Sequence, residues 1–170
     1  SDGAGAMLLE ATTSEKHRIV KSTHLFSDGR HGDKLFVPGG GSLNPASHET
    51  LHKGMHYVKM RGNELFKIAV KAMADAAEVA LQHNGLTVVD IDLVVPHQAN
   101  LRMMEAIAKK LSIPMEKVMV TVDYYGNSSA ATVPTAFDKA LRTGRIQEGD
   151  TVLAVAFGAG VTWASTLIQW

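Results

Sequence analysis

The sequence has no cysteine at any of its 170 positions. This absence excludes disulfide bonds and thiolate metal sites, and it excludes a cysteine nucleophile within the chain. Nothing in the composition marks an oxidising compartment. We therefore expect no metal site, and any covalent thiol chemistry must come from another polypeptide.

The sequence also lacks a net charge and a long apolar run. Its 17 basic and 17 acidic side chains cancel, so no global field attracts the chain to nucleic acid or to an anionic membrane. No apolar run approaches the roughly 20 residues that span a bilayer, and the first residues lack the basic region of a signal peptide. These features predict a soluble, cytoplasmic protein.

Apolar residues make up 45% of the chain, which suits the core of one ordinary α/β domain. The patterning predicts helices at residues 62–81, 99–111 and 130–142, and strands at residues 4–10, 19–26, 91–95, 118–122, 151–157 and 161–170. The last two strands are joined by glycines and should form an antiparallel hairpin. We therefore expect a mixed β-sheet layered with helices.

Three segments add detail to this prediction. The helix at residues 62–81 has almost no polar face, which predicts burial on most sides. The strand at residues 4–10 begins almost at the first residue, as if the chain were cut from something longer. Residues 38–47 are rich in glycine, proline and serine, but no strand-to-helix passage surrounds them. They are typical of a surface excursion and not of a phosphate-binding loop.

Three polar or glycine-rich stretches each follow an apolar strand, at residues 96–100, 126–131 and 157–160. Ligands of α/β sheets gather at such strand ends. His97 stands at a strand-to-helix junction, where a helix amino terminus would favour the neutral imidazole. Asn127 stands in a turn that could aim its amide N–H at the same point. Two neutral donors converging on one oxygen make an oxyanion hole.

Each of these residues also has a simpler interpretation when taken alone. His97 could be a helix-capping or hydrogen-bonded core histidine, and Asn127 could be a turn former without function. Phe157 would ordinarily belong to the core. Only the joint arrangement favours a catalytic site.

That arrangement resembles a known family. Residues 94–102, 126–134 and 156–163 are similar to the histidine motif, the asparagine motif and the terminal glycine turn of the β-ketoacyl-acyl carrier protein synthase III family, within the thiolase superfamily. Residues 2–6 and 61–67 match as well, so the likeness covers nearly the whole chain in family order. It implies a thiolase-like half-domain, with residues 1–15 ending the amino-terminal half and residues 16–170 forming the carboxy-terminal domain.

The resemblance also implies a reaction. The family joins acyl-CoA to malonyl-acyl carrier protein by a decarboxylative Claisen condensation, using a Cys-His-Asn set whose cysteine lies in the amino-terminal half. His97 and Asn127 would hold the enolate oxygen. The backbone N–H of Ala159 would serve the second oxyanion hole, and Phe157 would line the seam beside the nucleophile. No cofactor is implied beyond the acyl-CoA and phosphopantetheine-carried substrates themselves.

The same resemblance implies partners for this chain. They are acyl carrier protein, acyl-CoA, the amino-terminal half and a second copy in a homodimer. Gly62, Asn63 and Ala99 would line the substrate tunnel, and the acidic carrier would dock on Lys67, Arg102, Lys109 and Lys110. The alternative for these cations is a solvated helix face, because Glu105 and Lys109 have the spacing of an ordinary i,i+4 pair.

Two other functions remain open at this point. The chain could come from a relative that transfers acyl groups to a different acceptor on the same scaffold. It could also be a non-catalytic subunit that pairs with a complete partner, which the missing nucleophile would favour and the retained His97 and Asn127 would disfavour.

Overall fold

The computed structural model describes residues 1–13 and 18–170. The main sheet has four strands in the order β1 (Ile19–Ser27), β6 (Thr162–Gln169), β5 (Thr151–Gly158) and β4 (Leu93–Pro96). The long helices are α2 (Gly62–His83), α3 (Leu101–Leu111) and α5 (Thr132–Arg142), and α4 (Val122–Tyr125) is a single turn. Four 3-10 turns complete these elements, namely η1 (Gly29–Lys34), η2 (Val88–Asp90), η3 (Met115–Lys117) and η4 (Ser129–Ala131).

The sheet is mixed, as the sequence predicts. β4 and β5 run parallel, whereas β6 is antiparallel to both β5 and β1. The β5–β6 hairpin follows from the two apolar stretches and from the glycines between them. The α/β class and the mixed sheet layered with helices are confirmed.

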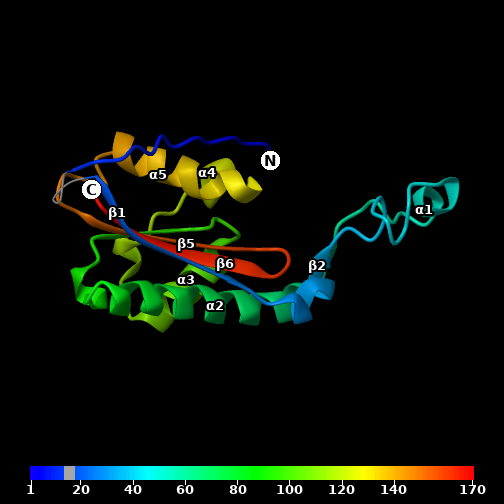
Figure 1. The fold of residues 1–170 in the computed structure, drawn as a ribbon, viewed down its shortest axis with the longest axis horizontal. Helices are drawn as coiled ribbons and strands as arrows, with labels where there is room; N and C mark the ends of the chain where they lie inside the picture. The colour runs from blue at the N-terminus through cyan, green and yellow to red at the C-terminus, as the bar shows by residue number, and fades with distance from the viewer. Residues whose placement is uncertain (14–17) are drawn as a thin grey trace.

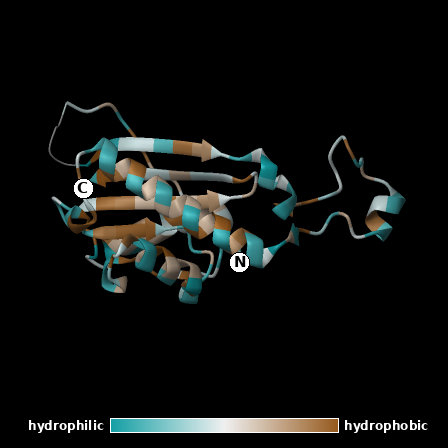
Figure 2. Ribbon diagram, turned by 90° about the horizontal axis from the view of Figure 1, so that it is seen from below, coloured by the Kyte–Doolittle hydropathy of each residue, from teal (hydrophilic) through white to brown (hydrophobic). Residues whose placement is uncertain are grey.

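Helices cover both faces of this sheet (Figure 1). Successive strand residues alternate between the two faces. In β4, Val94 packs with α2 and α3 in one core cluster, whereas Leu93 and Val95 pack with α5 in the other. Figure 2 shows apolar residues concentrated in the strands and polar residues mainly along helices and loops.

The helix α2 carries one narrow polar stripe on an otherwise largely buried surface. Lys67, Lys71, Glu78 and Gln82 are exposed, and their spacing of four or seven residues places them along one stripe. The opposite side is buried, with Ala69, Met73, Ala77 and Ala80 among its members. The expected burial on most sides is confirmed for residues 65–81, of which only Lys67, Lys71, Glu78 and Val79 are exposed.

Two expected strands are absent. Residues 118–122 make only one isolated bridge, between Val118 and Val94, before the chain turns into α4. Residues 4–10 form no strand either. They pass over the start of α5, where Gly5 lies against Pro134, and no strand of the main sheet pairs with them. The expected domain boundary between residues 15 and 16 lies outside the described residues.

An arm projects from the body between β2 (Leu35–Phe36) and β3 (Lys59–Met60), which pair with each other (Figure 1). It carries the short helix α1 (His48–His52), capped by the Ser47 side chain. This agrees with the surface excursion predicted for residues 38–47. Across the described residues, no helix combines the length and apolar character that a bilayer crossing requires.

Candidate active site

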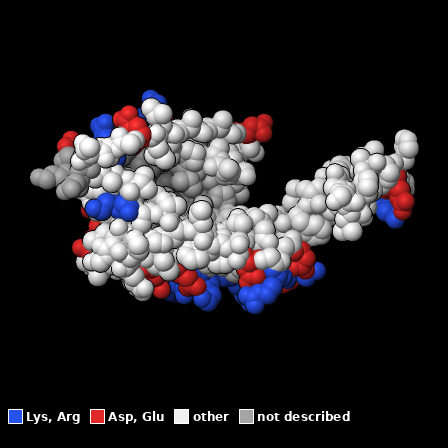
Figure 3. All heavy atoms as spheres, in the orientation of Figure 1, with Lys and Arg blue, Asp and Glu red and all other residues white. Residues whose placement is uncertain are grey.

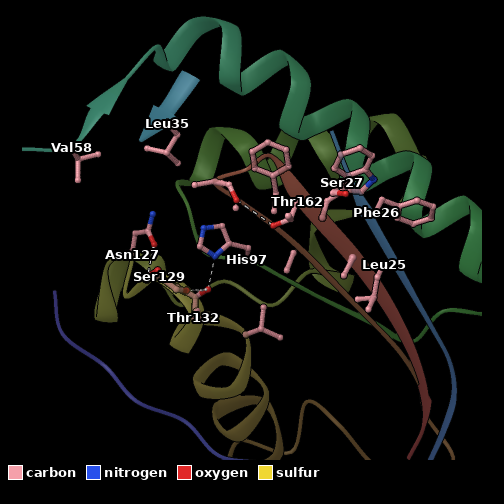
Figure 4. Close-up of a pocket in the computed structure, with 18 residues that line it drawn as sticks. Leu25, Phe26, Ser27, Leu35, Val58, His97, Asn127, Ser129, Thr132 and Thr162 are labelled. Atoms are coloured by element: carbon pink, nitrogen blue, oxygen red, sulfur yellow. Dashed lines mark hydrogen bonds between the residues drawn. The ribbon is translucent and has the colours of Figure 1, made fainter. Parts of the chain in front are cut away.

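A cleft of about 940 Å³ opens where β4 and β5 end (Figure 4). Its lining includes four residues singled out in the sequence: His97, Asn127, Phe157 and Ala159. They come from three separate connections, after β4, after α4 and around the β5–β6 turn. The structure thus brings the two polar motifs and the glycine turn together at one edge of the sheet. We refer to this space as the cleft.

His97 is held at the cleft by its backbone and its ring. Its backbone N–H donates to the Val155 carbonyl at 2.8 Å, extending the pairing of β4 with β5 by one residue. Its Nδ1 lies 2.6 Å from Thr132 Oγ1. Figure 4 shows the other ring nitrogen on the side away from Thr132, toward Asn127.

Burial lowers the pKa of His97 below its ordinary value of 6.5. The sequence therefore predicted the direction of the pKa shift of His97, but the cause of the shift is different. Helix α3 begins only at Leu101, with Asn100 as its cap, and the field of a helix end falls off within one turn. Loss of hydration, and not the amino terminus of α3, is therefore the cause of the lowered pKa of this imidazole.

Asn127 has its amide oriented by a backbone contact. Its Oδ1 accepts a hydrogen bond from the Ser129 N–H at 3.0 Å. Because a backbone N–H can only donate, the amide oxygen must face Ser129 and the amide nitrogen must face away. In Figure 4 that nitrogen points away from Ser129, toward the open part of the cleft. The turn therefore leaves two N–H donors available there.

The far wall of the cleft is aromatic and apolar. Phe26 of β1 stacks on Trp163 of β6, with ring centroids 5.7 Å apart, and Phe157 is the β5 partner of Trp163. Leu25 of β1 also lines the cleft and is 78% exposed. No Asp, Glu, Lys or Arg occurs among the described residues that line it. Figure 3 shows uncharged atoms within the hollow between the α5 layer and the arm, with acidic atoms at its upper rim.

Neutral donors in such a place act mainly on developing negative charge. A site with few competing charges and little water strengthens each hydrogen bond to an anionic oxygen. The amide nitrogen of Asn127 and the His97 ring are the polar groups positioned to do this. The arrangement is suited to holding an enolate or tetrahedral oxygen.

The comparisons with known proteins agree with this geometry. The family described as 3-oxoacyl-[acyl-carrier-protein] synthase III C terminal matches residues 81–170. The chain belongs to this family. It is 48% identical over 169 residues to the β-ketoacyl-[acyl-carrier-protein] synthase III of Caldanaerobacter subterraneus, covering 99% of this chain and 50% of that protein.

Solved structures of synthase III proteins share the fold. The Thermus thermophilus protein superposes with a TM-score of 0.79 at 40% identity, over 90% of this chain and 46% of its own. The Pseudomonas aeruginosa protein superposes with a TM-score of 0.82 at 32% identity, over 94% and 47%. The chain spans about half the length of the relatives it matches. The thiolase-like half-domain expected from the sequence is confirmed.

Three residues predicted to line a substrate tunnel in this synthase III domain lie outside the cleft lining. Gly62 and Asn63 are exposed in the first turn of α2. Ala99 is half-buried between β4 and α3 and packs against the core cluster beneath them. Their role as tunnel residues stays a prediction.

The predicted docking cations are all exposed, as docking would require. Arg102, Lys109 and Lys110 belong to α3, and Lys67 belongs to α2, which packs against α3. Figure 3 shows Lys and Arg atoms gathered along the edge formed by α2, with Asp and Glu atoms among them. The surface therefore carries both signs of charge, since α2 and α3 together contain five Lys or Arg and four Asp or Glu residues.

Sequence reasoning missed two residues that support the site. Thr132, 1% exposed, contacts the His97 ring, and Gln98, fully buried, binds four backbone groups of the two segments that lead to His97 and Asn127. The position of Gln98 inside the histidine motif was a usable signal, since a buried amide must be hydrogen-bonded. Thr132 offered no such signal, because its partner lies 35 residues away in the sequence.

Proposed function

We propose that this chain is the carboxy-terminal half of a β-ketoacyl-acyl carrier protein synthase III, which condenses acyl-CoA with malonyl-acyl carrier protein. The observation that carries the proposal is the convergence of His97 and Asn127, from separate connections, on one uncharged cleft. A purely structural histidine and a purely turn-forming asparagine would not be expected to line the same cavity beside Phe157 and Ala159.

In this reaction the malonyl thioester binds with its carbonyl oxygen toward His97 and Asn127. The bond to the carboxylate breaks, carbon dioxide leaves, and the electron pair passes into an enolate whose negative oxygen is held by the two donors. Their prior orientation lowers the barrier, because no donor has to reorganise as the charge develops. The enolate carbon then forms the new carbon–carbon bond.

The electrophile in this proposal is an acyl thioester on a cysteine of the amino-terminal half. The attacked carbonyl oxygen becomes negative and is held by the cysteine's own N–H and that of Ala159. Collapse of this intermediate expels the thiolate and releases the β-ketoacyl product on its carrier. Phe157 lies between the two oxyanion holes and keeps water from the thioester.

The proposal also assigns partners and organisation. Residues 1–15 end the amino-terminal half, residues 16–170 form the second domain, and the complete protein is a cytoplasmic homodimer. Acyl carrier protein docks on Lys67, Arg102, Lys109 and Lys110, and its pantetheine passes Gly62, Asn63 and Ala99 on the way to the cleft. These cations are exposed on adjoining helices, which is the surface that an acidic partner needs.

A chimera tests the proposal. Residues 1–170 would replace the carboxy-terminal half of the Caldanaerobacter subterraneus relative, and product formation from acetyl-CoA and malonyl-acyl carrier protein would be measured. We expect condensation by the chimera. The isolated chain should remain unlabelled by radioactive acetyl-CoA, because it has no thiol. A folded chimera that acquires the acyl label and never forms product would refute the proposal.

A further inference from the structure

The first residues of the chain lie against the segment that carries Asn127. Figure 1 shows the amino-terminal end of the trace, in blue, running beside α4 and α5. Residues 1–5 have no regular secondary structure, and we call them the strap. Gly3 and Gly5 both approach the segment beneath, as alternate residues of an extended chain do.

Both glycines lie too close to their neighbours to carry a side chain without movement. A Cβ built on Gly3 would stand 2.8 Å from the Cβ of Ser128 and 3.0 Å from its Oγ. A Cβ built on Gly5 would stand 2.6 Å from the Cγ of Pro134. Ordinary contacts of a Cβ lie at 3.4–4 Å. Because neither glycine has a positive φ, it is the close contact, and not the backbone conformation, that requires glycine here.

The turn at Asn127 has little support of its own. Neither Asn127 nor Ser128 donates its backbone N–H to a backbone carbonyl of the described residues. Ser129 has a φ of +57°, a left-handed conformation that residues other than glycine seldom adopt. Its N–H nevertheless has to stay 3.0 Å from the Oδ1 of Asn127 to orient the amide. Packing from outside therefore has to hold this turn in place.

We propose that Gly3 is a positioning residue, through which the strap holds the Asn127 turn at the cleft. Gly3 lies against Ser128, the residue that follows Asn127 in the chain. It also faces Ala131, whose Cβ would stand 3.4 Å from a Cβ on Gly3. The strap thus contacts both ends of the short segment that contains Ser129. Gly3 does not line the cleft, so it acts on the site only through this contact.

Gly5 gives the strap a second anchor two residues further on. Its partner Pro134 belongs to the first turn of α5, which begins at Thr132. Thr132 contacts the His97 ring, so this anchor lies on the helix that supports the other half of the site. Two contacts in sequence fix both the position and the direction of the strap. The strap is therefore the firm side of the contact, and the turn is the side that follows.

The consequence for catalysis rests on the proposed function. A Cβ on Gly3 would require a movement of about 0.6 Å to restore an ordinary contact with Ser128. If the strap keeps its place, the turn moves and takes the amide of Asn127 with it. A displaced donor stabilises the developing enolate less well. Ala159 belongs to the separate β5–β6 turn, so acyl transfer to the cysteine should be spared.

The test compares variants of the chimera by crystal structure and by the two half-reactions. Gly3→Ala adds the Cβ. Gly41→Ala is the matched control, because Gly41 is exposed, has no positive φ and has open space around it. Gly3→Ala is also combined with Ser128→Gly, which removes both conflicting atoms, and with Ser128→Ala, which keeps the Cβ. Each Ser128 variant alone is the reference for its pair.

We expect Gly3→Ala to displace the Asn127 amide by about 0.5 Å and to slow malonyl decarboxylation about 10- to 100-fold, because misplacement by 1 Å can cost about 100-fold. Acyl transfer should change little, and Gly41→Ala should behave like the unsubstituted chimera. Ser128→Gly should cancel the effect of Gly3→Ala, whereas Ser128→Ala should not. Such selective rescue would not follow from a general loss of stability.

An Asn127 amide that stays in place in the Gly3→Ala structure, because the strap yields instead, would overturn the proposal. So would equal losses in both half-reactions without rescue by Ser128→Gly. If Gly3→Ala alone failed to fold, its pair with Ser128→Gly would decide, because that pair has to fold and react like Ser128→Gly alone. The displacement of Asn127 as expected, with no decarboxylation by any protein including the unsubstituted chimera, would count against the proposed function alone.

Discussion

The side chain of Gln98 accepts a hydrogen bond from the backbone N–H of Thr121 at 2.7 Å, across 23 residues of sequence. The same Oε1 accepts from the Val122 N–H at 3.2 Å. Its Nε2 donates to the carbonyls of Pro96 and Met119, at 2.8 and 3.0 Å. Gln98 thereby ties the connection that carries His97 to the segment that leads to Asn127.

We predict that Gln98→Leu lowers the free energy of unfolding by about 2–4 kcal/mol, because it leaves several buried backbone groups without partners. Chemical denaturation of the chimera would measure this loss. Gln82→Leu, at an exposed site on α2, is the control and should cost less than about 0.5 kcal/mol. Equal stability of the two variants would show that the hydrogen bonds of Gln98 do not stabilise the connection between these two segments.

Charge reversal tests the docking surface on α2 and α3. Glu in place of Lys67, Arg102 or Lys109 should raise the apparent KM for malonyl-acyl carrier protein about two- to fivefold per charge. The KM for acyl-CoA should stay nearly constant, and added salt should reproduce the effect. Lys21→Glu, exposed on β1, serves as the control. Similar changes for both substrates would favour a merely solvated helix face.

The isolated chain should associate or bind hydrophobic dyes. The source of this behaviour is not α2, because the apolar side of α2 is covered by the sheet and α3. The exposed apolar surface lies elsewhere, as shown by Leu8, Leu25 and Leu43, which are 93%, 78% and 90% exposed. Covering such surface is favourable by about 25 cal/mol per Å².

Light scattering on dilute residues 1–170, with and without an amino-terminal half added in trans, would measure this association. Added half-molecules should suppress it. A monodisperse monomer that unfolds cooperatively and binds no dye would contradict the expectation.

The lowered pKa of His97 has a consequence for stability. Below its ordinary pKa of about 6.5 the unfolded chain binds a proton at His97 that the folded chain refuses. The contribution of His97 to stability is therefore complete above pH 6.5 and declines as the pH falls toward the folded-state pKa. Comparing wild type with His97→Gln in urea at several pH values should show the difference between them shrinking on acidification. A difference that grows would mean that the folded site favours the imidazolium.

The sequence predicted the fold where local signals and tertiary structure agree. The hairpin of β5 and β6 is an example, since apolar strands and a glycine turn leave few alternatives. Residues 118–122 had the composition of a strand, but Gln98 takes the backbone N–H groups of Thr121 and Val122. A side chain therefore replaces the neighbouring strand, and no local pattern reveals such a substitution.

The candidate site was likewise predicted only in part: the location of its residues was predicted, and their orientation was not. The strand-end rule placed His97 after β4, but Asn127 follows α4 and not a strand, so its place beside His97 was predicted by the family motifs alone. The orientation of each side chain did not follow. Hydrogen bonds with Thr132 and Ser129 set those orientations. These contacts form only when η4 and α5 pack against β4, which no local pattern in the sequence predicts.

The most direct test of the central claim separates the two half-reactions in the chimera carrying His97→Ala or Asn127→Ala. Malonyl decarboxylation and acyl transfer from acetyl-CoA to the cysteine would be measured independently. We predict that decarboxylation falls about 10²–10³-fold for each lost donor while acyl transfer stays near its original rate. Equal losses in both half-reactions, or no loss of decarboxylation, would contradict the assignment of His97 and Asn127 to the enolate oxygen.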